Sequence, residues 1–123
     1  MNHTMRLAAA LLGLCVAAGA SAQTYPSKPV RLVVGFAPGG AADTVARALA
    51  DGLGRALGQS IVVENRAGAG SSIAAEHVAK SPPDGYSVLI ASPSSISVNP
   101  ALNPKLNYRA SDLTPIIKVS SSP

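Results

Sequence analysis

The chain has 123 residues, a formal net charge of +4 at pH 7 and only 13% charged residues. This length allows one small domain at most, and the scattered basic residues form no run or stripe of the kind that binds nucleic acid, so no nucleic-acid partner is expected. Cys15, the single cysteine, lies in an apolar run near the N-terminus, so the rest of the chain has no thiol for a disulfide, a nucleophile or a cysteine-based metal site.

Residues 1–22 are predicted to be a cleaved signal peptide. Arg6 precedes an apolar run from Leu7 to Gly19, and Ala20-Ser21-Ala22 has the small residues that signal peptidase accepts. The apolar run is too short for a permanent transmembrane helix. We therefore expect an exported protein that begins near Gln23.

The segment Val30–Asp43, VRLVVGFAPGGAAD, organises the rest of the predicted fold. Its apolar start favours a short strand that is buried on both faces of a parallel sheet. Pro38, Gly39 and Gly40 end the strand, and helical spacing begins at Ala41. Because the first amides of a helix have no intrahelical partner and the dipole favours anions there, we expect this turn to hold a carboxylate.

A helix is predicted over Ala41–Leu57, with Gly58 as its C-terminal cap. The spacing of three and four residues predicts a buried face of Val45, Leu49, Leu53, Ala56 and Leu57. The opposite, solvent-exposed face carries Arg47, Asp51 and Arg55.

The chain then repeats the same pattern. Elements are predicted in this order: a strand over Ile61–Val63, a glycine-rich turn over Glu64–Ser72, a helix over about Ser72–Lys80, a strand over Tyr86–Ala91, a serine- and proline-rich loop over Ser92–Ser97, a helical turn within Val98–Leu106 and a fourth apolar segment over Ile116–Val119.

The alternation of strands and helices predicts an α/β fold in which a parallel sheet is flanked by helices. Ligands of such sheets bind beyond the carboxyl ends of the strands. We therefore expect three loops to lie side by side at that end, namely Phe36–Asp43, Arg66–Ser72 and Ser92–Ser97.

Motifs for other chemistries are weak or missing in the sequence. No complete G-x-G-x-x-G, P-loop or G-x-S-x-G motif is present. His77 is the only histidine beyond the leader, and the acidic residues are dispersed. We therefore expect no catalytic residues, no metal and no cofactor, and predict that the protein is not an enzyme.

Several candidate residues have two interpretations. Gly39, Gly40 and the glycines of the second turn either permit tight turns or let a ligand approach the backbone. Asp43 either complements the helix dipole or orders bound water or a ligand amine. Ser71 and Ser72 are candidate helix N-caps, a role that does not exclude contact with a ligand. Arg66 either binds a ligand carboxylate or pairs with nearby Glu64.

The sequence resembles the substrate-binding proteins of tripartite tricarboxylate transporters, the Bug-type extracytoplasmic solute receptors of bacteria. The resemblance runs along nearly all of the exported chain and rests on these segments, in order: YPSKPVRLVVGFAPGGAADTVARALADGL, VVENRAGAGSSIAAEHVAKSPPDGYSVLIAS, NPAL and DLTPI.

This resemblance implies a periplasmic binding protein, type II-like, with two α/β domains and a small organic carboxylate in the cleft between them. It implies large and small membrane permease subunits as partners. In the family, backbone groups of the two glycine turns hold one carboxylate, partly through water. The third loop faces the variable end of the ligand. Carried over, the ligand-binding residues are Phe36, Ala37, Pro38, Gly39, Gly40, Asp43, Gly68, Ala69, Gly70, Ser71, Ser72, Ser92 and Ser94.

The chain departs from the family pattern in two ways. Ser71 stands where a glycine is common, Ala67 where proline is common and Ala74 where glycine is usual. The family also continues into a second domain, so residues 23–123 correspond to the N-terminal part of the first domain, and we expect a truncated product or fragment. The alternatives to a carboxylate receptor are a non-functional fragment and a small exported α/β hydrolase.

Overall fold

The computed structural model describes residues 24–121, so the predicted signal peptide over residues 1–22 lies outside the described residues. The strands β1 (Val30–Val34), β2 (Ile61–Asn65) and β3 (Ser87–Ile90) form one parallel sheet in the order β2-β1-β3. The register pairs Leu32 of β1 with Val63 on one side and Val88 on the other. The predicted α/β class with a parallel sheet is confirmed.

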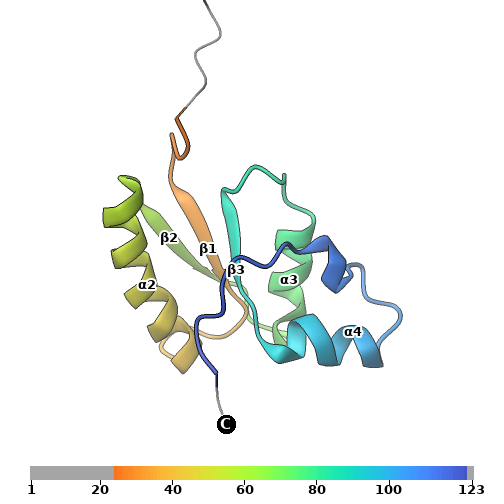
Figure 1. The fold of residues 1–123 in the computed structure, drawn as a ribbon. Helices are drawn as coiled ribbons and strands as arrows, with labels where there is room; N and C mark the ends of the chain where they lie inside the picture. The colour runs from red at the N-terminus through yellow and green to blue at the C-terminus, as the bar shows by residue number, and fades with distance from the viewer. Residues whose placement is uncertain (1–23, 122–123) are drawn as a thin grey trace, which may run out of the picture.

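Two helices cover the sheet. Helix α2 (Ala41–Leu57) packs on β1 and β2, and α3 (Ser72–Ala79) packs on β3 and β1 (Figure 1). Since β2 and β3 lie on opposite sides of β1, right-handed crossovers put the two helices on opposite faces of the sheet. All three strands point their carboxyl ends toward the same end of the molecule, at the bottom of Figure 1.

The hydrophobic core lies between α2 and the sheet. Leu32, Val34 and Ala46 are its buried centre. The residues packed against them alternate along each strand, as one face of a sheet requires, and comprise Ala42, Ile61, Val63, Val88 and Ile90.

The predicted buried face of the Ala41–Leu57 helix is wrong, because the helix is rotated about its axis so that a neighbouring face meets the sheet. Ala46 and Ala50 are buried, whereas Val45 and Leu53 are 40% and 41% exposed. Alanines let the helix backbone approach the sheet closely, and the bulkier residues then flank the contact over a narrow three-stranded sheet. Spacing alone identifies an apolar stripe but not which edge of it touches the sheet.

Other boundaries differ in detail. Strand β2 continues two residues past the predicted Val63, to Asn65, because β1 pairs along its full length. The expected loop after β3 contains a π-helical turn over Ser94–Val98, followed by the short helix α4 (Asn99–Leu102). The apolar segment Ile116–Val119 has no regular structure, and Ile117 is 81% exposed.

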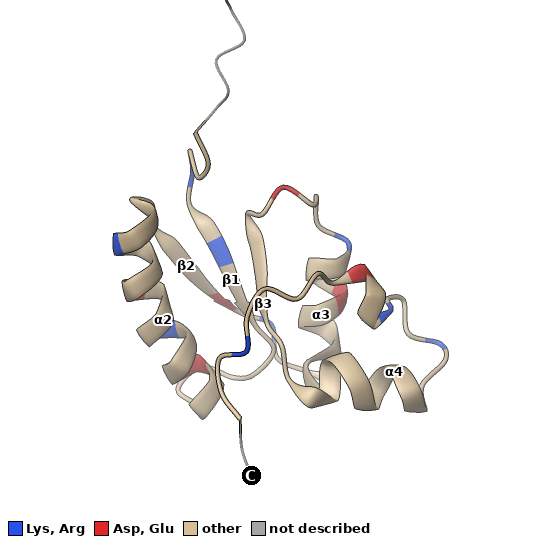
Figure 2. Ribbon diagram, viewed as in Figure 1, with Lys and Arg blue, Asp and Glu red and all other residues tan. Residues whose placement is uncertain are grey.

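The helices of residues 24–121 were compared with the length and hydropathy that a membrane-spanning helix requires. No helix in this part of the chain is both long enough and apolar enough to cross a bilayer. Acidic and basic residues are interspersed along the ribbon of the described residues (Figure 2).

Candidate ligand site at the carboxyl ends of the strands

The structure brings the three predicted loops into contact at the carboxyl end of the sheet. The second turn meets the start of the first where Gly35, the residue between β1 and the first turn, lies against the Ser71 side chain. The second turn meets the third loop where Gly70 lies beside Ser94 and Asn99. The predicted proximity of the loops is therefore present in the fold.

The first turn is held by a carboxylate at its own helix. Asp43 is 3% exposed, and its Oδ2 accepts hydrogen bonds of 2.9 Å from the Gly39 amide and from Arg47 Nε. Asn65 at the end of β2 donates to Asp43 Oδ1 at 2.9 Å and to the Phe36 carbonyl at 3.1 Å. Asp43 therefore joins the turn, α2 and β2 into one unit.

These contacts lower the pKa of the Asp43 carboxyl group far below its ordinary value. The hydrogen bond from Arg47 contributes most, followed by the Gly39 amide and the Asn65 side chain. Each donor favours the ionised carboxylate over the neutral acid. Asp43 is thus a permanent anion near neutral pH, and its negative charge is compensated inside the turn.

The second turn has an unusual backbone. Ala69, Gly70 and Ser71 have φ angles of 46°, 60° and 71°, and Gly68 has a φ of 135°. Left-handed conformations are disfavoured for residues with a Cβ atom, at a cost of about 1–3 kcal/mol each. Such a turn persists only where its surroundings hold it.

Ser71 lies at the junction of the first and second turns. It is 1% exposed, and among the described residues its Oγ has no hydrogen-bond partner. A Cβ atom on Gly35 would lie 1.8 Å from this oxygen, so the strand end must be glycine for Ser71 to fit. Ser71 precedes α3 as its N-cap residue, yet its side chain makes no capping hydrogen bond.

The third loop is fastened to the second turn by side chains. Asn99 Nδ2 donates to Ser72 Oγ at 2.7 Å and to the Ala69 carbonyl at 3.0 Å. The buried Tyr108 donates to the Ser95 carbonyl at 2.6 Å. Within the loop, the Ser92 amide donates to Ser95 Oγ at 3.1 Å. Ser92 and Ser94, the predicted contacts for the far end of a ligand, are half-buried.

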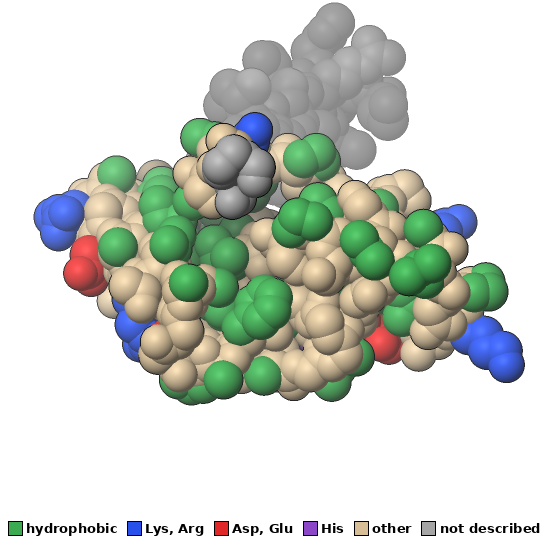
Figure 3. Space-filling model, turned by 90° about the horizontal axis from the view of Figure 1, so that it is seen from below, with side chains coloured by type: hydrophobic (Ala, Val, Ile, Leu, Met, Phe, Trp, Pro, Cys, Tyr) green, Lys and Arg blue, Asp and Glu red, His purple; other side chains and the backbone are tan. Residues whose placement is uncertain are grey.

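Both long helices begin at this end without a side-chain cap. Gly40 at the start of α2 and Ser71 at the start of α3 provide no capping hydrogen bond. The first amides of an α-helix have no partner within that helix. At α3, the Ser71 and Ser72 amides donate instead to the Gly68 and Ala69 carbonyls of the second turn. In the view from below, the described surface here is largely hydrophobic or tan, with charged side chains at the rim (Figure 3). An anion at this site would therefore be bound mainly by backbone groups.

Sequence inspection missed three residues that shape these loops: Asn65, Asn99 and Tyr108. Each is a single polar residue whose partners are between 13 and 36 residues away in the chain. The only available signal was the position of Asn65 in the predicted turn, two residues after the predicted strand Ile61–Val63.

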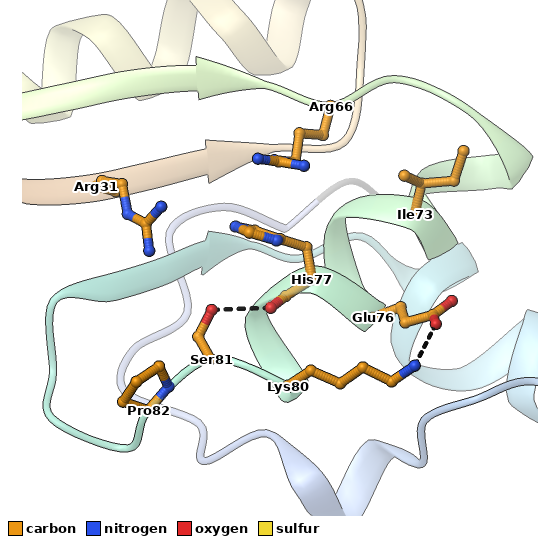
Figure 4. A pocket seen from close by; sticks show the side chains of 8 residues that line it. All are labelled: Arg31, Arg66, Ile73, Glu76, His77, Lys80, Ser81 and Pro82. Carbon is orange, nitrogen blue, oxygen red and sulfur yellow. Dashed lines mark hydrogen bonds and ion pairs between the residues drawn. The ribbon is translucent and has the colours of Figure 1, made fainter.

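A separate groove of about 580 Å³ lies on the α3 side of the sheet. It is lined by basic and other residues from β1, the end of β2 and α3, with His77 beside Arg31 and Arg66 (Figure 4). Its charges are largely paired, because Arg66 Nε donates to Glu64 at 2.6 Å and Lys80 Nζ to Glu76 at 2.5 Å. The interpretation of Arg66 as a partner of Glu64 is confirmed.

Among residues 24–121, no group of three or more His, Cys, Asp or Glu side chains is arranged to hold a metal ion. At the carboxyl ends of the strands, two helices begin without a side-chain cap at a largely uncharged surface.

Comparison with known proteins identifies close relatives. The model of the tripartite tricarboxylate transporter receptor family matches residues 45–123. The chain is 42% identical over 130 residues to the protein BugT of Bordetella pertussis, covering 100% of this chain and 39% of BugT. It thus spans about two fifths of the length of that relative.

Solved structures agree with this similarity. MatC from Rhodopseudomonas palustris with bound malate is 42% identical, with a TM-score of 0.65, over 70% of this chain and 29% of that one. A second R. palustris protein, with adipate, is 46% identical, with a TM-score of 0.56, over 57% of this chain and 23% of that one.

Proposed function

Because the chain belongs to the tripartite tricarboxylate transporter receptor family, we propose that it binds a small organic carboxylate in the periplasm and delivers it to the permease subunits of such a transporter. The matched family is one of transporter receptors, and the similar solved structures include a TctC solute binding protein from Polaromonas and a periplasmic transporter, which supports a receptor rather than an enzyme. Two of the similar structures carry dicarboxylates, malate and adipate, which supports this class of ligand.

One observation in this chain carries the proposal. Two uncapped helix N-termini, those of α2 and α3, begin at adjoining turns at the same end of one sheet. Each N-terminus attracts an anion, and its amides donate hydrogen bonds in the direction of that anion. A carboxylate placed between them is met by donors from both helices.

The magnitudes indicate which interaction dominates. Two helix dipoles contribute about 2 kcal/mol together at an exposed site. Micromolar affinity requires about 8 kcal/mol. Charge-assisted hydrogen bonds contribute about 1.5–3 kcal/mol each, so several directed amides supply most of the affinity. The position of the backbone in the two turns therefore matters more than the net charge of the protein.

The proposed ligand contacts divide among the three loops. In the first turn, the Gly39 amide is engaged by Asp43, so Gly40 and the first amides of α2 face the carboxylate. Phe36, Ala37 and Pro38 form the exposed wall of that turn. The second turn contributes backbone groups of residues 68–72. Ser92 and Ser94 face the far end of the ligand.

The test is a matched pair of glycine substitutions in the purified protein. A Cβ atom on Gly40 lies 3.5 Å from the Ala37 carbonyl, and one on Gly52 meets nothing within 4 Å. Gly40→Val places bulk where the carboxylate would sit, so we expect malate and adipate affinity to fall at least about tenfold in calorimetric titrations, about 1.4 kcal/mol. Gly52→Val, elsewhere in α2, is the control with unchanged affinity.

Two results would contradict the proposal. The first is that the wild-type protein binds neither acid nor any member of a panel of di- and tricarboxylic and aromatic acids. The second is that Gly40→Val and Gly52→Val bind with the same affinity as the wild type, which would place the ligand away from the first turn.

A further inference from the structure

We propose that Asn99 is a positioning residue of the ligand site, which holds the second turn in its left-handed conformation so that the Gly70 amide faces the bound carboxylate. Asn99 is the first residue of α4, beyond the third loop, and is about thirty residues away from the turn it contacts. The inference rests on the proposed function for the identity of the ligand.

The contacts of one side-chain amide carry the inference. Asn99 Nδ2 donates to the carbonyls of Ala69 and Gly70 at 3.0 and 3.3 Å, and to Ser72 Oγ at 2.7 Å. The two carbonyls belong to the residues whose φ angles are 46° and 60°. Holding both carbonyl oxygens fixes the two peptide planes, which also carry the N–H groups of Gly70 and Ser71. The Ser71 amide donates to the Gly68 carbonyl, so Asn99 directs the Gly70 amide toward the ligand.

The hydroxyl groups of Ser72 and Tyr108 connect Asn99 to the third loop. Tyr108 has a single hydroxyl proton, and its short contact with the Ser95 carbonyl, 2.6 Å, uses that proton. Across the 3.3 Å contact between the two hydroxyl groups, Ser72 is therefore the donor. The hydrogen bonds then run in one direction, from Asn99 through Ser72 and Tyr108 to the backbone of the third loop, and such chains strengthen each member.

This arrangement has a consequence for the ligand. The Ser72 hydroxyl is occupied on both sides, by Asn99 as its donor and Tyr108 as its acceptor. The second turn then offers its backbone rather than this hydroxyl to the carboxylate. Asn99 also fixes the separation between the second turn and Ser94, whose Cβ lies beside Gly70.

The experiment compares three variants of the purified protein. Asn99→Asp keeps the size of the side chain and removes both N–H donors, and Asn99→Ala removes the whole amide. Asn103→Ala is the control, since Asn103 closes the other end of α4 and accepts a hydrogen bond from the Lys105 amide at 3.1 Å, away from the turn.

The first measurement needs no ligand. In the wild type, the Ser71 amide donates to the Gly68 carbonyl at 2.9 Å, and the Ser72 amide donates to the Ala69 carbonyl. Hydrogen exchange at these two amides should accelerate about tenfold in both Asn99 variants, the effect of losing one hydrogen-bond anchor. Exchange at Val33 in the centre of β1, and the Tm, should change little, whereas a general loss of stability would alter both.

The second measurement is the affinity for malate and for adipate by calorimetry. We expect Asn99→Asp and Asn99→Ala to weaken both acids by about tenfold, since both share the carboxylate end. Asn103→Ala should bind as the wild type does.

The outcomes separate the two proposals. Exchange at Ser71 and Ser72 that is the same in Asn99→Asp as in Asn103→Ala contradicts the positioning role, whatever the affinities are. Exchange that accelerates while affinity for malate and adipate stays at the wild-type value also contradicts it. A wild-type protein that binds neither acid contradicts the proposed function, and the exchange rates still report whether Asn99 holds the turn.

Discussion

Asp43, a predicted ligand-binding residue, makes its hydrogen bonds to other residues of the protein. Its carboxylate accepts hydrogen bonds from Arg47, from the Gly39 amide and from Asn65, and is almost fully buried. The sequence suggested that Asp43 either complements the helix dipole or orders bound water or a ligand amine. These contacts show a further role, because they fasten the first turn to α2 and β2. Any influence on a ligand then passes through the shape of the turn.

The low pKa of Asp43 predicts a specific dependence of stability on pH. Since the pKa is lower in the folded than in the unfolded state, the ionised carboxylate stabilises the fold fully above the unfolded pKa of about 3.9. This stabilisation is lost as the pH falls below that value. In urea unfolding at pH 6 and pH 3, the wild type should therefore lose more stability than Asp43→Asn between the two pH values.

The control for this measurement is Asp51→Asn, which changes an exposed aspartate of the same helix. It should follow the wild type at both pH values. An Asp43→Asn variant whose stability declines in parallel with the wild type would show that the hydrogen bonds of Asp43 add nothing to folding.

The close contact between Gly35 and Ser71 predicts the effect of substitutions on stability. A Cβ atom on Gly35 would lie 1.8 Å from Ser71 Oγ and 2.8 Å from Ser71 Cα. Gly35→Ala should thus destabilise the protein by about 1–3 kcal/mol in urea unfolding, as overpacking of a buried site does. Adding Ser71→Gly to Gly35→Ala should recover part of the loss, because the closest atoms are removed.

Ser71→Gly alone should stabilise the fold by about 1 kcal/mol, since it relieves the φ of 71° and removes a buried hydroxyl without a partner. Gly52→Ala, where a Cβ meets nothing within 4 Å, is the tolerated control. Additive effects of Gly35→Ala and Ser71→Gly would contradict a direct clash between the two residues.

Helix α2 shows what periodicity predicts about an element and what it leaves open. Its bounds and the left-handed Gly58 at its end agree with the sequence prediction, because apolar spacing and a C-terminal glycine are local signals. The contact face is different, since Ala46 and Ala50 rather than Val45 and Leu53 meet the sheet.

This contact face is testable by substitution. Ala46 is fully buried, so Ala46→Leu should lower the free energy of unfolding by about 1–3 kcal/mol through overpacking. Leu53→Gln, on the exposed flank, should change it by about 0.5 kcal/mol or less. The measurement is urea unfolding. A larger loss of unfolding free energy in Leu53→Gln than in Ala46→Leu would support the contact face predicted from the spacing.

At the scale of the whole molecule, the order β2-β1-β3 places the two long helices on opposite faces and their N-termini at one end. This arrangement brings separate segments of the chain together at the candidate site. It also explains why the third loop matters to the second turn, since Asn99 and Tyr108 connect segments distant in sequence.

The sequence by itself determined the elements and the class of fold. Buried strands, glycine turns and amphipathic spacing are local patterns, and their β-α-β-α-β order leaves a parallel sheet as the natural arrangement. The convergence of the three loops followed from the same rule, because parallel strands end on one edge.

Only the tertiary structure decided how the site is held. The face of α2, the contact of Gly35 with Ser71, the fastening by Asp43 and Asn65, and the hydrogen bonds of Asn99 depend on residues that meet across the fold. A single Asn or Tyr has no periodicity, and its partners are set by how helices and loops pack. Such contacts exist only once the chain has folded.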